Sequence, residues 1–324
     1  MSEAGNQTNN LGRIVIFGAS GFISKALQEK LVKYGLIFKA VSREELDLAN
    51  SQCGERLSEF IKPNDTLVFL SANLPAGGQT ISSLMGNLTM AENIARALSK
   101  KRVNHFVYMS SEAVYDADRI PMDEDSSREP VSLYALMHTA REMMLDEICS
   151  QQKIPLIRLR PSYVYGSGHA QNNYGPNSFI RSALQNQEIK LYGRGEERRS
   201  FLFIEDLAEI LVEVIKEKKE GVLNVVADRS FSYLEVAKYV IKNCPWPIRI
   251  AFEPRKIKTI HRPYKITQLF RFIYNLGRPI SPVVHRTYSN RAIRNAFPKF
   301  NFTPLEKGIE KAMALLKDPP IVGK

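Results

Sequence analysis

A buried strand that runs directly into a glycine-rich turn and a helix constrains this chain more than any other segment. Residues 13–17 are an apolar run, Gly18-Ala19-Ser20-Gly21 follows at once, and residues 22–34 have the apolar spacing of a helix. Gly18 permits a tight turn, and Gly21 lets backbone N–H groups approach an anion at the helix N-terminus. A Gly-x-x-Gly pair alone is weak evidence for a dinucleotide site. Here, however, a strand, the turn and a helix follow one another in the order that such a site requires to bind a pyrophosphate. The sequence therefore predicts a dinucleotide site that includes Gly18, Ser20, Gly21, Phe22 and Ile23.

The first half of the chain continues this alternation of short apolar runs and amphipathic stretches. Runs that are apolar along their whole length indicate strands buried on both faces, covered by helices on two sides. The expected strands are residues 13–17, 37–41, 66–70, 105–109 and 156–159, and the expected helices are 22–34, 54–61, 82–99 and 132–150. The predicted fold class is α/β, with a Rossmann-type doubly wound parallel sheet.

The composition changes after residue 161. Gly, Asn and Tyr dominate residues 163–176, as in a loop. Helical spacing returns at 179–187, 204–218, 233–242 and 303–316, with a strand at 222–226. We therefore expect a disordered lead-in (1–11), a dinucleotide-binding domain (12–165) to which 201–226 return, and a smaller mixed α/β substrate-binding lobe (166–200 and 227–324).

The net charge of +11 is a local feature of one late segment. Twelve of the 45 Lys and Arg residues, but only one of the 34 acidic residues, lie between 249 and 300, so the remainder is balanced. Within the segment, residues 264–274 are an aromatic-rich helix candidate with cationic flanks. It can lie on an anionic membrane surface, or pack on the second lobe with its charges in water. Nucleic acid is not expected, since no motif for it accompanies the charge.

Targeting signals and cysteine use point to the cytoplasm. Residues 1–10 lack the charged-then-apolar order of a signal peptide, and no run approaches the roughly 18 apolar residues of a membrane span. Cys53, Cys149 and Cys244 lack the spacing of a disulfide framework or a metal site. We expect a cytoplasmic protein without a metal, and the basic segment leaves peripheral membrane association open.

The end of the second predicted strand bears on which dinucleotide binds. Ser42-Arg43 stands where an acidic residue usually accepts the ribose 2′-hydroxyl of NAD. An arginine there suits the 2′-phosphate of NADP, and the alternative is an arginine solvated on a loop. The sequence favours NADP over NAD.

Three further segments carry chemistry. Val107-Tyr108-Met109-Ser110-Ser111-Glu112-Ala113-Val114-Tyr115 is a strand that ends in hydroxyls, Ser132-Leu133-Tyr134-Ala135-Leu136-Met137-His138 opens a helix, and Arg160-Pro161-Ser162-Tyr163-Val164-Tyr165-Gly166 follows the next strand. With the glycine turn, these segments resemble the extended short-chain dehydrogenase/reductase superfamily, specifically its nucleotide-sugar epimerases, dehydratases and reductases. The resemblance continues through Arg199-Ser200-Phe201 and 204–208, and covers most of residues 13–230.

The resemblance implies a catalytic group of three residues. Tyr134 takes the place of the tyrosine that moves a hydroxyl proton, and Ser111 that of the hydroxyl that holds the same oxygen. A free phenol has a pKa near 10, which must fall for it to act as a base near neutrality. His138 stands where the family has a lysine that binds the nicotinamide ribose. Either His138 performs this task, as a donor or as a cation, or the chain has lost catalysis and kept binding.

The resemblance also implies the remaining binding residues. Besides the glycine turn, Arg43, Tyr134 and His138, the expected cofactor contacts are Asp47, Leu48, Ser71, Ala72, Asn73 and Pro161. The expected substrate contacts are Glu112, Tyr163, Arg181 and Arg199, of which Arg199 takes the place of an arginine that grips the nucleotide diphosphate. Tyr163 departs from the asparagine that is frequent there, which puts the usual substrate pose in doubt.

One more departure narrows the reaction. Glu112-Ala113 stands where the family's 4,6-dehydratases carry an Asp-Glu pair, and Ala113 cannot transfer protons. The sequence therefore predicts an NAD(P)-dependent nucleotide-sugar epimerase or reductase, serving surface-polysaccharide and nucleotide-sugar metabolism. Relatives often dimerise through a helix pair, so a homodimer is a further expectation. The alternative is a catalytically impaired dinucleotide-binding protein that regulates a partner.

Overall fold

The computed structural model of the protein describes residues 11–75, 78–115, 120–168, 175–254 and 283–317. The predicted lead-in lies outside the described residues except for Leu11, and so does the helix candidate at 264–274. Every helix within the described ranges is too short or too polar to cross a membrane.

A six-stranded parallel sheet forms the larger part of the molecule. Its strands are β1 (Ile14–Phe17), β2 (Phe38–Val41), β3 (Thr66–Phe69), β4 (His105–Met109), β5 (Leu156–Pro161) and β9 (Gly221–Val225). They lie in the order β2-β1-β3-β4-β5-β9, and every neighbouring pair is parallel. The strand order reverses between β1 and β3, and a crevice at that point is where such sheets bind ligands.

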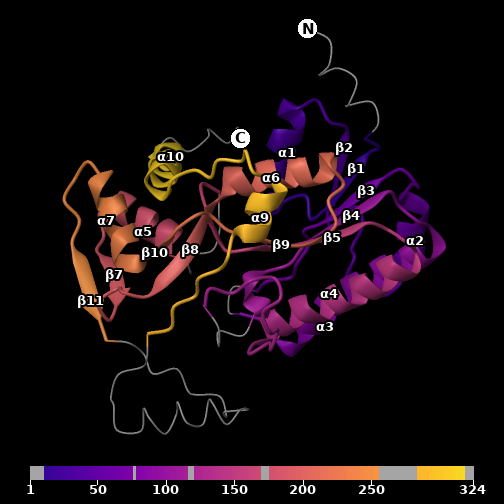
Figure 1. Ribbon diagram of the computed structural model, residues 1–324, viewed down its shortest axis with the longest axis horizontal. Coiled ribbons are helices and arrows are strands. Elements are labelled where there is room, and N and C mark those ends of the chain that lie inside the picture. The colour runs from indigo at the N-terminus through magenta and orange to yellow at the C-terminus, as the bar shows by residue number, and fades with distance from the viewer. Residues whose placement is uncertain (1–10, 76–77, 116–119, 169–174, 255–282, 318–324) are drawn as a thin grey trace, which may run out of the picture.

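Helices cover both faces of this sheet, so the predicted fold class is confirmed (Figure 1). Along β1, Ile14 and Ile16 join one apolar cluster while Val15 and Phe17 join the other, as the two-residue period of a strand requires. The first cluster takes α1 (Phe22–Lys33), α6 (Ile204–Lys216) and α9 (Arg291–Ala296), and the second takes α2 (Cys53–Phe60), α3 (Ile81–Lys100) and α4 (Leu133–Gln151).

The remaining elements form a smaller layer beside the large sheet, on the left of Figure 1. One small sheet has the order β10-β8-β6, and another pairs β11 with β7. These strands are β6 (Tyr163–Tyr165), β7 (Ile189–Tyr192), β8 (Arg198–Phe203), β10 (Ser230–Ser232) and β11 (Ile250–Glu253); the helices beside them are α5 (Gly175–Leu184), α7 (Tyr233–Lys242) and α10 (Leu305–Lys317). The apolar side chains of these helices and strands pack together in a third hydrophobic cluster.

The chain crosses between the two parts more than once. β8 leads directly into α6 on the large sheet, β9 pairs with β5 there, and β10 then returns to pair with β8. A later segment ties the parts together: the backbone N–H of Arg286 donates to Arg198 (3.1 Å), and Met122 exchanges two backbone bonds with Thr287 and Ser289 (2.9 and 2.7 Å). This segment lies within the basic stretch and was not predicted as structure.

The loop predicted at 163–176 is wrong at both of its ends, and residues 169–174 between them lie outside the described residues. Residues 163–165, expected to be loop, form β6 against β8. The chain is already helical at Gly175, before the predicted start at 179. Pro176 is tolerated because the first turn of a helix has N–H groups without intrahelical partners, so the missing N–H costs little.

Candidate active site

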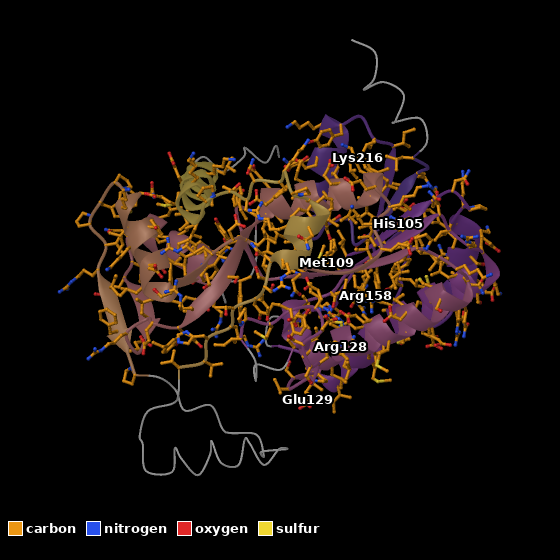
Figure 2. The ribbon with its side chains drawn as sticks, in the orientation of Figure 1. His105, Met109, Arg128, Glu129, Arg158 and Lys216 are labelled. Carbon is orange, nitrogen blue, oxygen red and sulfur yellow. The ribbon has the colours of Figure 1, made fainter. Side chains whose placement is uncertain are left out.

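A cavity of about 610 Å³ opens where four parallel strands end. Figure 2 labels the residues at the two ends of β4. Met109, at the carboxyl end, lines the cavity, and His105 lies at the amino end of the same strand. Eleven of the residues predicted for the site line it: Gly21, Phe22, Ile23, Ser71, Ala72, Ser111, Glu112, Tyr134, His138, Pro161 and Tyr163. Its volume is in the range of small-molecule sites.

The glycine turn has the geometry that a pyrophosphate needs. Gly18 has φ +103, and a Cβ there would lie 3.1 Å from the backbone nitrogen of Ser71, so only glycine fits between β1 and the segment after β3. Gly21 caps α1 without a side chain, which leaves the first N–H groups of the helix for an anion. Gln28 donates to Ala19 O and Ser24 Oγ (2.8 and 3.0 Å) and holds the turn against the helix.

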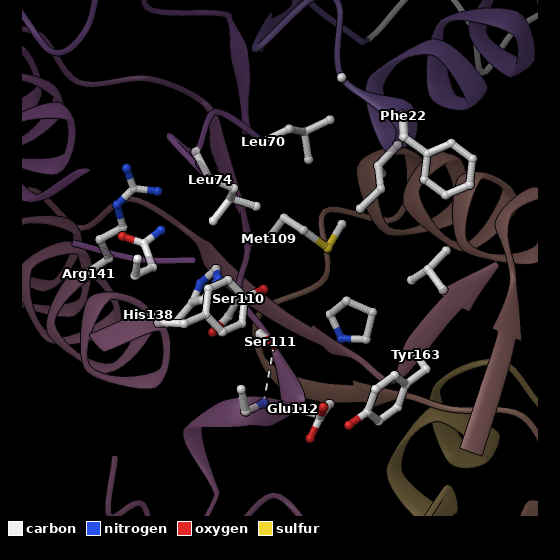
Figure 3. A pocket seen from close by; sticks show the side chains of 18 of the residues that line it. Phe22, Leu70, Leu74, Met109, Ser110, Ser111, Glu112, His138, Arg141 and Tyr163 are labelled. Carbon is white, nitrogen blue, oxygen red and sulfur yellow. Dashed lines mark hydrogen bonds between the residues drawn. The ribbon is translucent and has the colours of Figure 1, made fainter. Parts of the chain in front are cut away.

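Ser111 and Tyr134 reach the cavity from two different elements. Ser111 follows β4, and its Oγ accepts a hydrogen bond from the N–H of Ala113 (3.2 Å), which begins the short 3-10 helix η2 (Glu112–Val114) (Figure 3). Tyr134 is the second residue of α4, whose N-terminus is capped by the hydroxyl of Ser132 (3.1 Å to the N–H of Ala135). Local capping therefore fixes both backbones beside the cavity.

The surroundings of His138 favour its neutral form, so the structure supports the role of a donor over that of a cation. Burial, with the nearby charge of Arg141, lowers the pKa of His138 to about 3. Its Nδ1 lies 2.8 Å from the phenol oxygen of Tyr108. The ring of Tyr134 packs edge-on against the imidazole, with 4.7 Å between centroids. The donor role of His138 remains compatible with this geometry.

Arg141 lines the cavity and was missed by the sequence analysis. Figure 3 shows it on the same side as His138, which lies three residues earlier on α4. Its guanidinium donates to Asn87 O (2.8 Å), Asn87 Oδ1 (3.0 Å) and Ser71 O (2.9 Å), and it stacks over Phe69 at 4.6 Å. Arg141 follows Tyr134 by seven residues, which places both side chains on one face of the helix. This spacing was visible in the sequence and could have identified Arg141 as a candidate.

Glu112 is held by two residues from the late basic segment. Its Oε2 accepts hydrogen bonds from Arg286 Nη1 (3.2 Å) and from the hydroxyl of Tyr288. Burial by itself would lower the pKa of Arg286, but the negative charge of Glu112 outweighs that effect, and the pKa of Arg286 is raised. Arg286 lines the cavity too, so the site contains a guanidinium that no local sequence pattern indicated.

Arg199 lies behind the cavity rather than in its wall. Its guanidinium donates to the backbone oxygens of Arg198 (2.9 Å) and Val284 (2.6 Å) and to Glu197 (2.7 Å). It also lies 5.8 Å from the ring centroid of Tyr163, which does line the cavity. With these partners, Arg199 supports Tyr163 and the 284–286 backbone in this conformation.

The other predicted residues take various positions around the site. Gly18 and Ser20 form the turn itself, and Asn73 exchanges hydrogen bonds with Asn87 (2.8 and 2.9 Å). Arg43 is exposed and pairs with Asp47 at 3.3 Å, while Leu48 is buried in the second cluster. Arg181 lies on α5, and burial lowers its pKa. None of these is among the described residues that line the cavity.

Comparison with known proteins identifies the family of this chain. Residues 14–226 match the NAD dependent epimerase/dehydratase family, which is well over half of the chain. The chain belongs to this family. The description of the family names NAD, the dinucleotide without a 2′-phosphate.

Two curated relatives illustrate the range of similarity within the family. The dTDP-D-glucose 4,6-dehydratase of Bos taurus is 30% identical over 151 residues, which are 46% of this chain and 42% of that protein. The UDP-N-acetyl-alpha-D-glucosaminuronate decarboxylase of Bacillus cytotoxicus is 26% identical over 258 residues, 70% of this chain and 78% of that protein. The chain spans about half the length of the dehydratases that it matches.

Solved structures confirm the fold. The UDP-glucose 4-epimerase of Thermus thermophilus, in complex with NAD, has a TM-score of 0.75 at 19% identity, over 95% of this chain and 100% of that chain. The UDP-glucuronic acid 4-epimerase of Bacillus cereus, in complex with UDP-glucuronic acid and NAD, also has a TM-score of 0.75, at 17% identity, over 94% of this chain and 99% of that chain.

Proposed function

We propose that the protein is an NAD(P)-dependent nucleotide-sugar epimerase or reductase. The observation that carries the proposal is the convergence of Tyr134, Ser111 and the helix that follows Gly21 on one cavity. The family supplies a second line of support, because relatives and structural neighbours include epimerases, dehydratases and a decarboxylase named for nucleotide sugars. Surface-polysaccharide assembly is the metabolic setting that we propose for it.

The residues fit a dinucleotide and a sugar hydroxyl side by side. The turn from Gly18 to Gly21 and the N-terminus of α1 would hold the pyrophosphate, and Ser71, Ala72 and Pro161 would line its path. When bound, the nicotinamide supplies hydride chemistry at a sugar carbon. Tyr134 takes the proton of the reacting hydroxyl on oxidation and returns it on reduction, while Ser111 holds the same oxygen.

The lining of the cavity favours epimerisation or reduction over elimination. Elimination of water needs a further group that removes a proton from the sugar carbon skeleton. Glu112 is engaged by Arg286 and Tyr288, and its neighbour Ala113 has no titratable group. The activity of the dehydratase relatives is therefore not the one that we propose for this chain.

Two finer features complete the proposal. Arg43, exposed at the end of β2, would pair with the 2′-phosphate of NADP, so we propose that NADP is preferred over NAD. The helices α3 and α4 expose Ile81, Met85, Leu136 and Met143 (40–73% exposed), and we propose that this surface joins two copies of the chain.

Turnover measured with Tyr134→Phe tests the function. With a panel of nucleotide sugars and either dinucleotide, the wild type should convert at least one substrate, and Tyr134→Phe should lower kcat by about 10²-fold or more. Tyr239→Phe on α7, whose ring packs against Phe231, is the matched control and should retain activity. Unchanged turnover in Tyr134→Phe would rule out the proposed role.

The neutral His138 supports a second candidate function. With no cation at that position, the protein could bind the dinucleotide and regulate a partner without turnover. Tight dinucleotide binding together with no conversion of any nucleotide sugar tested would favour this candidate over the first.

A further inference from the structure

A buried polar cluster lies next to Tyr134, and the proposed reaction does not yet use it. Its members are Tyr108 on β4 and His138 and Arg141 on α4, which are 0%, 5% and 1% exposed. His138 and Arg141 line the cavity, and Figure 3 shows them on the side away from Tyr163. Burying three polar groups together is costly unless each has a partner, so their mutual arrangement carries information.

The contacts of Tyr108 determine which nitrogen of His138 carries the proton. Tyr108 is fully buried, so its O–H needs an acceptor within the protein, and Nδ1 of His138 lies 2.8 Å from the phenol oxygen. The O–H of Tyr108 therefore donates to Nδ1 of His138. A neutral imidazole that accepts at Nδ1 has its proton on Nε2, the ring nitrogen left for the cavity that His138 lines.

Arg141 brings a positive charge without a carboxylate to balance it. Its partners are the backbone oxygens of Asn87 and Ser71, the amide oxygen of Asn87, and the ring of Phe69. Within the described part of the chain, Arg141 forms no ion pair. Burial lowers its pKa, but the ordinary pKa of a guanidinium is so far above neutrality that Arg141 stays protonated. A buried cation of this kind is stabilised by an anion that appears beside it.

The other charged groups near the cluster are already engaged. Glu142, the next residue on α4, binds Arg160 (2.9 and 2.7 Å) and Arg128 (2.9 Å), and accepts from Ser110 (2.6 Å). On β3 and α3, the groups that pack against Arg141 are the uncharged Phe69, Asn87 and Met90. The charge of Arg141 acts on three titratable groups, which are His138, Tyr108 and Tyr134.

We propose that Arg141 and His138 together perform the two tasks that a single cation beside Tyr134 would perform. Arg141 supplies a fixed positive charge that stabilises the phenolate of Tyr134, and neutral His138 supplies an Nε2–H donor to a hydroxyl of the bound dinucleotide. Tyr108 is the positioning residue, because it fixes the tautomer and orientation of His138. This inference rests on the proposed function, since it takes Tyr134 as the acid/base.

The tautomer of His138 is tested without substrate or cofactor. In protein labelled with ¹⁵N-histidine at pH 7, the signals of His138, assigned by their loss in His138→Gln, should show a protonated Nε2 and a bare Nδ1. Tyr108→Phe should shift the Nδ1 signal and weaken dinucleotide affinity, and Tyr239→Phe should do neither. A protonated Nδ1 in the wild type, with or without a proton on Nε2, overturns the role of Tyr108.

The charge of Arg141 is tested through the titration of Tyr134. In protein labelled with ¹³Cζ-tyrosine, the Tyr134 signal, assigned by its loss in Tyr134→Phe, should titrate below the free-phenol value near pH 10. Its midpoint should rise by about one pH unit or more in Arg141→Met and return in Arg141→Lys. Arg158→Gln removes a partly buried charge that pairs with Asp146 and should leave the midpoint unchanged.

The outcomes separate the inference from the function on which it rests. A wild-type midpoint at or above the free value overturns the role of Arg141, and this measurement does not depend on the folding of any Arg141 variant. An unchanged midpoint in a folded Arg141→Met does the same. If the tautomer and midpoint are as expected but no nucleotide sugar is converted, the proposed function fails while the arrangement of the cluster stands.

Discussion

Nη1 of Arg286 lies 3.2 Å from Oε2 of Glu112, although 174 residues separate them in the chain. Both residues line the cavity, and the carboxylate of Glu112 occupies a guanidinium that could otherwise bind an anion there. In Glu112→Gln, the amide oxygen can still accept from Tyr288, but the charge of Arg286 is released. Affinity for a nucleoside diphosphate should therefore rise, by about five-fold for a gain of ~1 kcal/mol.

Isothermal titration with UDP as the probe measures this change. Arg286→Met should bind UDP more weakly than the wild type, and Asp146→Asn, which removes a carboxylate from a pair with Arg158, should bind it equally well. Weaker binding in Glu112→Gln would mean that Arg286 needs its partner in order to be oriented towards the ligand.

A second prediction concerns the buried ion pair behind β4. Glu142 binds Arg160 through both oxygens, and their side chains are 0% and 2% exposed. Glu142→Gln leaves the charge of Arg160 buried without compensation, so the free energy of unfolding should fall by about 3–5 kcal/mol. Urea unfolding measures it. Asp146→Asn breaks a half-exposed pair on the same helix and should change stability by less than about 1 kcal/mol; equal losses in the two variants would contradict the prediction.

The low pKa of His138 predicts a loss of stability in acid. Its pKa is about 3 in the folded protein and ~6.5 in the unfolded chain, so the unfolded chain binds more protons as the pH falls below about 6.5. The contribution is complete above that pH and is lost progressively towards pH 3, by up to about 1.4 kcal/mol per unit. Burial lowers the pKa of His105 too, so the test is a difference.

The free energy of unfolding of the wild type and of His138→Gln, measured at pH 7 and pH 5, gives this difference. The variant should lose less stability over that interval than the wild type does. Equal losses would indicate that His138 is solvated and titrates normally in the folded protein.

The surface of α3 and α4 gives a prediction about assembly. Met85 and Met143 are 56% and 63% exposed, so replacing them costs little in the folded chain. Light scattering should show a dimer for the wild type and monomers for Met85→Lys and Met143→Glu. Ile37→Glu replaces a side chain that is 75% exposed ahead of β2 and should leave the dimer intact. A monomeric wild type would exclude the proposed interface.

The parts of the fold that the sequence predicted correctly, and the predicted site residues that line the cavity, are specified by short segments. The turn at Gly18, the strand before it and the helix after it are contiguous, and both the apolar period and the glycines act over a few residues. Ser111 and Tyr134 also follow local patterns, each at the start of a helix that begins beside the cavity. Because the strands of the sheet are parallel, their carboxyl ends lie at the same edge of the sheet, and the residues that follow them come together there.

The parts that the sequence analysis missed depend on contacts between distant segments. Arg286 reaches the cavity because residues 285–289 pair with β8 and with Met122, and nothing near Arg286 in the sequence indicates this. Arg199 matches its motif, yet Val284 O and Glu197 take its guanidinium. Arg141 is different, since its spacing from Tyr134 was visible; only its burial, a tertiary property, identifies it as part of the site.

The choice between the two dinucleotides rests on Arg43. Its side chain is 74% exposed and pairs with Asp47 at 3.3 Å, an exposed contact that a phosphate can replace at little cost. A charge-assisted hydrogen bond to a 2′-phosphate is worth about 1.5–3 kcal/mol. Arg43→Ala should therefore raise the Kd for NADP by roughly 10- to 100-fold and leave the Kd for NAD nearly unchanged.

Fluorescence titration of both dinucleotides with the wild type and the variant separates the possible results. Arg56→Ala is the matched control, because Arg56 is exposed nearby and makes one long contact with Glu45 O, at 3.4 Å; it should alter neither Kd. If the wild type binds NAD more tightly than NADP and Arg43→Ala preserves that order, Arg43 is a solvated loop residue and the cofactor is NAD. A selective loss of NADP binding instead shows that the 2′-phosphate lies against Arg43, because no other group distinguishes the two molecules.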